Sequence, residues 1–141
     1  MALAVIDASV AVKWFLEEEG TAEALRLQEA FFEGILAIRV PAIFPWEVMN
    51  ALRYSGQFPT SDLREAAHDL DRAGFATMPL FGAYLERTIE LALALDITIY
   101  DASYVALAEI LACPLYTADE ALIGSAPTGV SVVSVEDYPP G

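Results

Sequence analysis

Four acidic residues in this chain sit where an apolar stretch ends or a helix is expected to begin, although long segments separate them. They are Asp7, Glu47, Asp101 and Asp119. Side chains at such positions can meet in one pocket, and their oxygens suit Mg²⁺ or Mn²⁺. Two such ions about 3.5–4 Å apart can stabilise both the attacking and the leaving oxygen of a phosphodiester. The residue types and positions therefore predict a metal-dependent phosphodiesterase.

The four carboxylates are expected to share the binding of cations. Asp7, Asp101 and Asp119 would hold an ion directly or through water. Glu47 would share a water molecule or a second ion. A bound cation lowers the pKa of water and so produces hydroxide as the nucleophile, and the predicted reaction therefore needs no protein nucleophile.

Three polar residues near these carboxylates in the sequence are expected to support them. Ser9 and Thr117 would orient a carboxylate or a phosphate oxygen by hydrogen bonding. Asn50 follows Glu47 by three residues, so both side chains would lie on one face of a helix. We therefore expect Asn50 to act behind the metal ligands.

Each acidic residue also has an ordinary structural interpretation. Asp7, Asp101 and Asp119 could each cap the N-terminus of a helix. Glu47 could be a first-turn glutamate that the helix dipole favours. All four structural roles would have to coincide for the pattern to be accidental, and we therefore favour the metal site.

Apolar runs and amphipathic segments alternate along the chain. Strands are expected at 2–6, 35–40, 76–78, 115–117 and 130–135, and helices at about 8–16, 21–33, 46–54, 60–73, 83–95, 102–112 and 119–123. This alternation predicts an α/β fold, a three-layer sandwich with a mainly parallel central sheet. Ligands of such folds bind beyond the carboxyl ends of the strands, where the four acidic residues are expected.

The composition favours one globular domain spanning residues 1–141. Hydrophobic residues make up 56% of the chain, and no linker or low-complexity tract interrupts it. The N-terminal residues lack the basic segment of a signal peptide and form too short a run to cross a membrane, so we expect a cytoplasmic protein. One cysteine, Cys113, and one histidine, His68, exclude a zinc site of the Cys/His type.

The charge balance is the strongest argument against a nucleic-acid enzyme. The net charge is −14, and the seven basic residues end at Arg87. Proteins that bind nucleic acid usually present a basic surface to the phosphates. Three explanations stay open: bound cations offset the charge of the pocket, a basic partner chain covers the acidic face, or the acidic surface serves solubility.

The motifs together resemble the PIN domain over nearly the whole chain. They are Asp7 with Ser9, Glu47 with Asn50, the stretch Tyr-Asp-Ala-Ser-Tyr-Val-Ala-Leu-Ala-Glu at 100–109, and Thr117-Ala-Asp119. Within that family the chain is most similar to the VapC-type toxin ribonucleases, which open with the same strand-Asp-x-Ser pattern. The resemblance implies a Mg²⁺- or Mn²⁺-dependent endoribonuclease that acts on RNA, forms homodimers and is blocked by a VapB-type antitoxin.

The acidic pocket also predicts the chemistry of such an antitoxin. Its inhibitory segment should be basic or apolar, with Arg or Lys placed among the four carboxylates, because charge-assisted hydrogen bonds are strong. A neighbouring reading frame for a small DNA-binding protein would support this prediction.

Two other functions stay open. A catalytically weak PIN-fold binding module would dock a basic protein on its acidic face and show no metal-dependent turnover. A phosphoacceptor receiver domain also carries acidic residues at strand ends, but it needs a lysine near its pocket. The only lysine, Lys13, is expected on the first helix, which disfavours a receiver.

The placement of several other side chains is left open by the sequence. Lys13 could reach a phosphate or lie on the surface. Six aromatic residues are expected mostly in the core, with some left for a dimer or partner surface. They are Trp14, Phe15, Phe31, Phe32, Phe44 and Trp46.

Overall fold

The computed structural model, which describes residues 1–139, is built around a parallel five-stranded sheet. The strands are β1 (Ala2–Ile6), β2 (Leu36–Pro41), β3 (Ala76–Met78), β4 (Leu115–Thr117) and β5 (Val132–Ser134). Their order across the sheet is β3-β2-β1-β4-β5, and every neighbouring pair is parallel. The chain thus returns to the centre of the sheet, next to β1, only after β3 has formed one edge.

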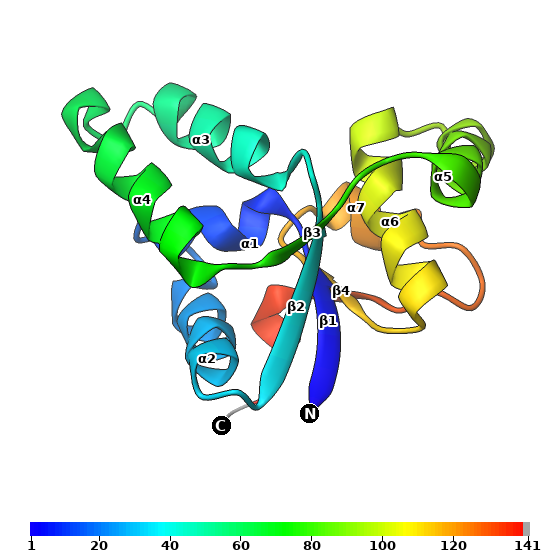
Figure 1. Cartoon of the computed structure of the whole chain (residues 1–141), viewed down its shortest axis with the longest axis horizontal. Helices are drawn as coiled ribbons and strands as arrows, with labels where there is room; N and C mark the ends of the chain where they lie inside the picture. Colours follow the sequence, from blue (N-terminus) through cyan, green and yellow to red (C-terminus); the bar gives the residue numbers. More distant parts are fainter. Residues whose placement is uncertain (140–141) are drawn as a thin grey trace.

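Helices cover both faces of this sheet (Figure 1). They are α1 (Ala8–Val12), α2 (Thr21–Phe32), α3 (Phe44–Tyr54), α4 (Leu63–Ala73), α5 (Gly82–Leu95), α6 (Ile99–Leu111) and α7 (Glu120–Gly124), with short 3₁₀ helices η1 (Thr60–Asp62) and η2 (Val135–Asp137). In Figure 1 the first four helices lie on one side of the sheet, and α5 and α6 lie on the other. The predicted three-layer α/β sandwich is therefore confirmed.

The central strand β1 is apolar because both of its faces are covered. Ala4, Val5 and Ile6 are fully buried, as expected of a strand in the middle of a parallel sheet. Ile6 pairs with Tyr116 of β4. This register places the residue after β1 beside the last residue of β4, and so joins two segments that are about 110 positions apart in the chain.

Several element boundaries differ from the sequence prediction. The first helix, α1, ends at Val12 rather than near residue 16, and β5 is shorter than the predicted strand. Helix α6 begins at Ile99, three residues earlier than predicted, because the Thr98 side chain caps it by accepting from the Asp101 amide. Residues 60–62 form a 3₁₀ turn before α4 and make no side-chain cap.

Two of the aromatic residues expected in the core are exposed. Phe44 is buried, but Trp46 is 78% exposed and Phe32 is 62% exposed. Lys13 is neither at the surface nor free to reach a phosphate, because it is buried and pairs with Glu18 at 3.0 Å. Hydrophobic periodicity alone does not fix which of these side chains a neighbouring element covers.

No single helix among the described residues is long and apolar enough to cross a membrane. Helices α5 and α6 reach that length and composition only as a pair, and the pair is bent by 117°.

Candidate active site

The four predicted acidic residues lie around the carboxyl ends of the two central strands. Asp7 follows β1 and caps α1, and Asp119 follows β4 and caps α7. Asp101 lies in the first turn of α6, and Glu47 lies in the first turn of α3. Strand ends and helix starts therefore supply all four, as the alternation of elements predicted.

Asp7 is held by hydroxyl groups from two segments. The Ser9 hydroxyl donates to Asp7 Oδ1 at 2.5 Å, and the Ser9 amide donates to the same oxygen at 3.1 Å. The Thr117 hydroxyl donates to Asp7 Oδ2. Hydrogen bonds to both carboxylate oxygens favour the ionised form, and so they oppose the effect of burying a side chain that is only 7% exposed.

The same two hydroxyls also fix the backbone after β4. Ser9 Oγ accepts from the Ala118 amide at 2.9 Å, and Thr117 Oγ1 accepts from the Asp119 amide at 3.0 Å. The two hydroxyl oxygens lie 3.3 Å apart. The loops after β1 and β4 are thus tied together, and the start of α7 is held next to Asp7.

The structure decides between the structural interpretations of the aspartates. Asp119 Oδ1 accepts from the amides of Ala121 and Leu122, so Asp119 is a helix cap in addition to any other role. Asp7 likewise caps its helix. The capping interpretation is wrong for Asp101, because Thr98 occupies that position.

Glu47 has a partner that the sequence analysis missed. The Tyr104 hydroxyl donates to Glu47 Oε1 at 2.7 Å, and the Tyr104 side chain is almost fully buried. Burial, together with the charge of Glu47, raises the pKa of Tyr104, so its hydroxyl keeps its proton and stays a donor. A signal was present, since Tyr104 lies one helical turn after Asp101 and so shares its side of α6.

Asn50 lies on the exposed side of α3 one turn after Glu47. Both residues line an open groove of about 1220 Å³ beside the cluster. Among the described residues Asn50 makes no side-chain hydrogen bond to Glu47 or to another carboxylate of the cluster. Its expected supporting role stays a prediction.

Asp101 is the electrostatic neighbour of the other three carboxylates. Burial raises the pKa of Asp7 to about 6, against the lowering effect of its hydrogen bonds, and the charge of Asp101 adds to the rise. The pKa of Glu47 is raised by burial and by Asp101. The pKa of Asp101 itself is raised by burial and by Asp119. The four side chains therefore share one anionic environment.

No basic side chain within residues 1–139 forms an ion pair with any of these four carboxylates. Oxygen-rich clusters of this kind suit hard divalent cations. As the side chains are placed, no three acidic, histidine or cysteine residues of the described part come close enough together to hold one ion at once. The donor types thus fit Mg²⁺ or Mn²⁺, and Asp101 and Asp119 are more exposed than Asp7.

Comparison with known proteins identifies the family. The model of the PIN domain matches residues 4–124. VapC ribonuclease Mb0985 of Mycobacterium bovis and ribonuclease VapC9 of Mycobacterium tuberculosis are each 34% identical over 134 residues, which cover 92% of this chain and 97% of each relative. The chain therefore belongs to the PIN-domain family, and the curated relatives that it matches are VapC ribonucleases.

Solved structures share the fold of this chain. PAE2754 from Pyrobaculum aerophilum matches with a TM-score of 0.65 and 24% identity, covering 96% of this chain and 92% of that one. A toxin–antitoxin complex from Klebsiella pneumoniae matches with a TM-score of 0.61 and 21% identity, with coverages of 94% and 97%. VapBC2 from Rickettsia felis, bound to a DNA fragment from its promoter, matches with a TM-score of 0.66 and 12% identity, with coverages of 94% and 98%. At these identities the likeness supports the fold alone.

Proposed function

We propose that this chain is a Mg²⁺- or Mn²⁺-dependent endoribonuclease, and that it is the VapC-type toxin of a toxin–antitoxin pair in the cytoplasm. The observation that carries the proposal is the gathering of four carboxylates around Asp101 without a basic side chain to neutralise them. A divalent cation is the natural counter-charge for such a cluster. The curated VapC ribonucleases, at 34% identity, supply the reaction class.

The residues of the chain would act in distinct ways. Asp7, Asp101 and Asp119 would hold the cation, and Glu47 would hold a water molecule or a second ion. When bound, the cation would supply Lewis acidity toward water and toward a phosphate oxygen. Ser9 and Thr117 keep both oxygens of Asp7 fixed, which prevents that ligand from turning away.

RNA cleavage tests this proposal directly. Purified protein with Mn²⁺ should cut unstructured RNA, and EDTA should stop the cutting. Asp101→Asn should reduce the rate by more than the roughly 10–100-fold typical of residues behind a metal site, because it removes the carboxylate that neighbours all the others. Asp96→Asn is the matched control, since Asp96 is exposed at the end of α5 in a left-handed conformation that Asn also tolerates.

Two results would contradict the proposal. Cleavage that survives EDTA or Asp101→Asn would show that another site or a contaminant does the chemistry. Tight binding of a basic protein with no metal-dependent turnover would instead favour the catalytically weak binding module.

We propose a VapB-type antitoxin as the partner of this site, because solved structures of the same fold include a toxin–antitoxin complex from Klebsiella pneumoniae and a member of the VapBC family of toxin-antitoxin systems from Mycobacterium tuberculosis. The four uncompensated carboxylates would receive an Arg or Lys from its inhibitory segment, and the rest of that segment would be apolar or basic. An inhibitory segment rich in Asp or Glu would contradict this prediction.

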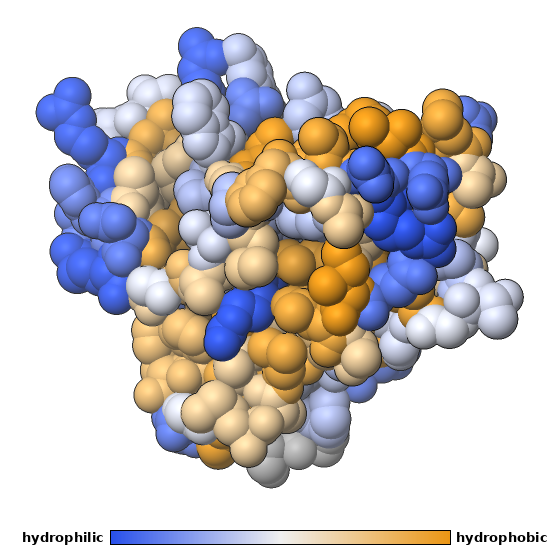
Figure 2. Space-filling view, turned by 45° about the vertical axis from the view of Figure 1, so that its right-hand side comes forward, coloured by the Kyte–Doolittle hydropathy of each residue, from blue (hydrophilic) through white to orange (hydrophobic). Residues whose placement is uncertain are grey.

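We also propose that the chain forms homodimers. Large apolar side chains are exposed on α5 and α6, among them Phe81 just before α5, Leu93 and Ile110. Figure 2, which turns this side toward the viewer, shows hydrophobic surface around a charged cluster. Sedimentation analysis of the purified protein tests the proposal, and a monomer at micromolar concentration would contradict it.

A further inference from the structure

The groove beside the carboxylate cluster connects two chemically different ends. It starts at Glu47 and at Tyr100, which lie in the first turns of α3 and α6. It extends along α3 to Arg53 near the end of that helix and to Arg64 at the start of α4. Glu47 is the only acidic residue among 1–139 that lines it, so the groove runs from the anionic cluster to a basic end.

Two exposed aromatic side chains flank the acidic end of the groove. Trp46 is 78% exposed and immediately precedes Glu47, while Tyr100 is 55% exposed and immediately precedes Asp101. Both side chains line the groove. Exposed indole and phenol faces next to a phosphodiesterase site are suited to stack against the bases of a single strand.

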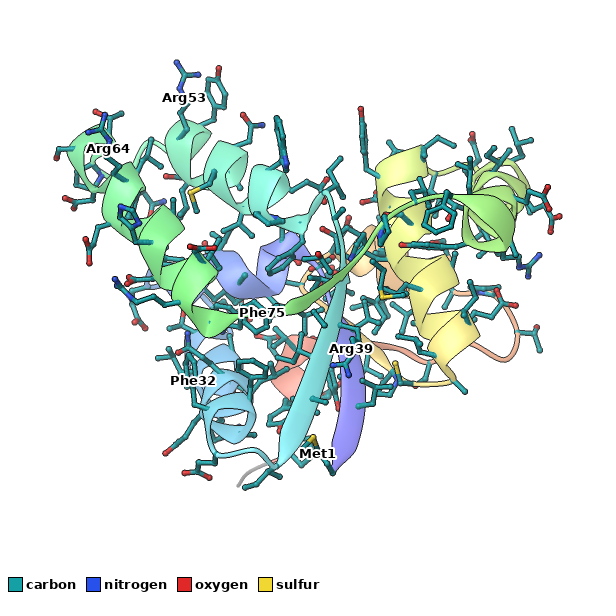
Figure 3. The ribbon with its side chains drawn as sticks, viewed as in Figure 1. Met1, Phe32, Arg39, Arg53, Arg64 and Phe75 are labelled. Carbon is teal, nitrogen blue, oxygen red and sulfur yellow. The ribbon has the colours of Figure 1, made fainter. Side chains whose placement is uncertain are left out.

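The arginines at the other end lack acidic partners. Three basic residues of the chain are held in ion pairs with carboxylates: Lys13, Arg72 and Arg87. Within residues 1–139, Arg53 and Arg64 form no ion pair, and Arg53 lies over the Tyr54 ring at 4.6 Å. Figure 3 shows Arg53 and Arg64 at the same end of the α3–α4 pair, pointing away from the body of the protein. Their charges are available to a ligand.

We propose that this groove binds the RNA strand that runs through the active site, with bases stacked on Trp46 and Tyr100 and backbone phosphates contacting Arg53 and Arg64. The inference rests on the proposed ribonuclease function. Arg53 follows Glu47 by six positions along the helix, about 9 Å of axial rise, which is a span that a few nucleotides cover. The strand would be recognised by stacking and charge, and so with little dependence on base sequence.

The net charge of −14 argued against binding of nucleic acid, but the groove has a local charge of its own. Among residues 1–139, the lining of the groove holds two arginines and one carboxylate, Glu47, so the lining itself is not acidic although the chain is. A basic inhibitory segment would be drawn to the four carboxylates and repelled from Arg53 and Arg64. The arginine end of the groove therefore suits a polyanion, whereas the carboxylate cluster suits the Arg or Lys of an inhibitory segment.

Tryptophan fluorescence tests the proposal. The full chain carrying Asp101→Asn, which blocks cleavage, is titrated with an unstructured RNA oligonucleotide of about eight nucleotides in the presence of Mn²⁺. Stacking on Trp46 should quench the emission. Trp14, the second tryptophan, is half-buried with its indole N–H donated to the Ala24 carbonyl at 2.9 Å, so its emission should stay constant. Trp46→Phe should therefore abolish the quenching while most of the affinity remains.

Substitutions then separate the two ends of the groove. Trp46→Ala should weaken RNA binding about tenfold. Arg53→Gln and Arg64→Gln should each weaken binding and each reduce the dependence of log K on log salt by about 0.7. Phe32→Ala and Arg39→Gln are matched controls, because Phe32 is a largely exposed aromatic outside the groove and Arg39 is a cation outside it. Neither control should change RNA affinity.

The outcomes distinguish this inference from the proposed function. Equal RNA affinity of the groove variants and the controls would overturn the inference, even if the wild-type chain cleaves RNA. Quenching by a partner peptide but not by RNA would also overturn it, since the groove would then be a protein-docking site. Quenching by RNA that the groove variants abolish would support the inference, even if the wild-type chain showed no cleavage.

Discussion

The carboxylate cluster and the neighbouring groove differ in how firmly their side chains are held. In the cluster, the buried Asp7 is fixed by two hydroxyls, and Glu47 is fixed by a buried tyrosine. In the groove, Trp46 and the two arginines are exposed and, within residues 1–139, have no acidic partner that fixes them. Chemistry on a phosphodiester requires fixed oxygens, whereas holding a strand of variable sequence requires only accessible rings and charges. Helix α3 contributes to both regions from adjacent positions, with Trp46 in the groove and Glu47 in the cluster.

The largest expected effect contrasts two aromatic residues at the start of α3. Phe44 is 1% exposed and packs in the core, so Phe44→Ala should lower the free energy of unfolding by about 3–5 kcal/mol. Trp46→Ala should change it by less than about 0.5 kcal/mol, because its side chain is mostly in solvent. Chemical denaturation measures both values. A large loss of stability in Trp46→Ala would show that Trp46, like Phe44, stabilises the fold, and would contradict the prediction.

A smaller effect is expected on the free energy of unfolding, because burying the charge of Asp7 destabilises the folded state. The pKa of Asp7 in the folded state, about 6, lies above its ordinary value of 3.8, so the native state binds the proton more tightly than the unfolded chain does. The free energy of unfolding therefore falls as the pH rises from about 4 to about 6. Above that range Asp7→Asn should stabilise the protein by about 1–3 kcal/mol in EDTA.

The direction in which Asp7→Asn changes the stability, and its dependence on pH, test this interpretation. Below pH 4 the advantage of Asp7→Asn over the wild type should vanish, because the wild-type carboxyl is then protonated in both states. Thermal unfolding at several pH values measures it. A variant less stable than the wild type at pH 7 would mean that the hydrogen bonds from Ser9 and Thr117 outweigh the burial of the charge.

The smallest expected effect concerns the support of Glu47. Tyr104→Phe removes the donor to Glu47 and should lower RNA cleavage about tenfold and stability by about 1 kcal/mol. Tyr84→Phe is the matched control, since its buried hydroxyl donates to the Ser103 carbonyl at 2.7 Å and touches no carboxylate of the cluster. It should cost similar stability and leave cleavage unchanged. Equal cleavage by the two variants would mean that Tyr104 has no positioning role.

The sequence was sufficient for the features that depend on nearby residues. Alternating apolar and amphipathic segments predicted all five strands and the three-layer architecture. The contact between Ser9 and Asp7 follows from a two-residue separation at the start of a helix. The start of α6 was predicted three residues too late, because Asp101 was the expected cap whereas Thr98 is the actual one, and both residue types can cap a helix.

Only the tertiary structure decided which distant groups meet. The hydroxyl of Thr117 reaches Asp7 because β4 lies beside β1, and no local pattern specifies that strand order. The same holds for Tyr104 and Glu47, and for the exposure of Trp46 and the pairing of Lys13 with Glu18. Local geometry limits a residue to a face or a turn, but the packing of whole elements determines what that face meets, since packing energy depends on every segment of the chain at once.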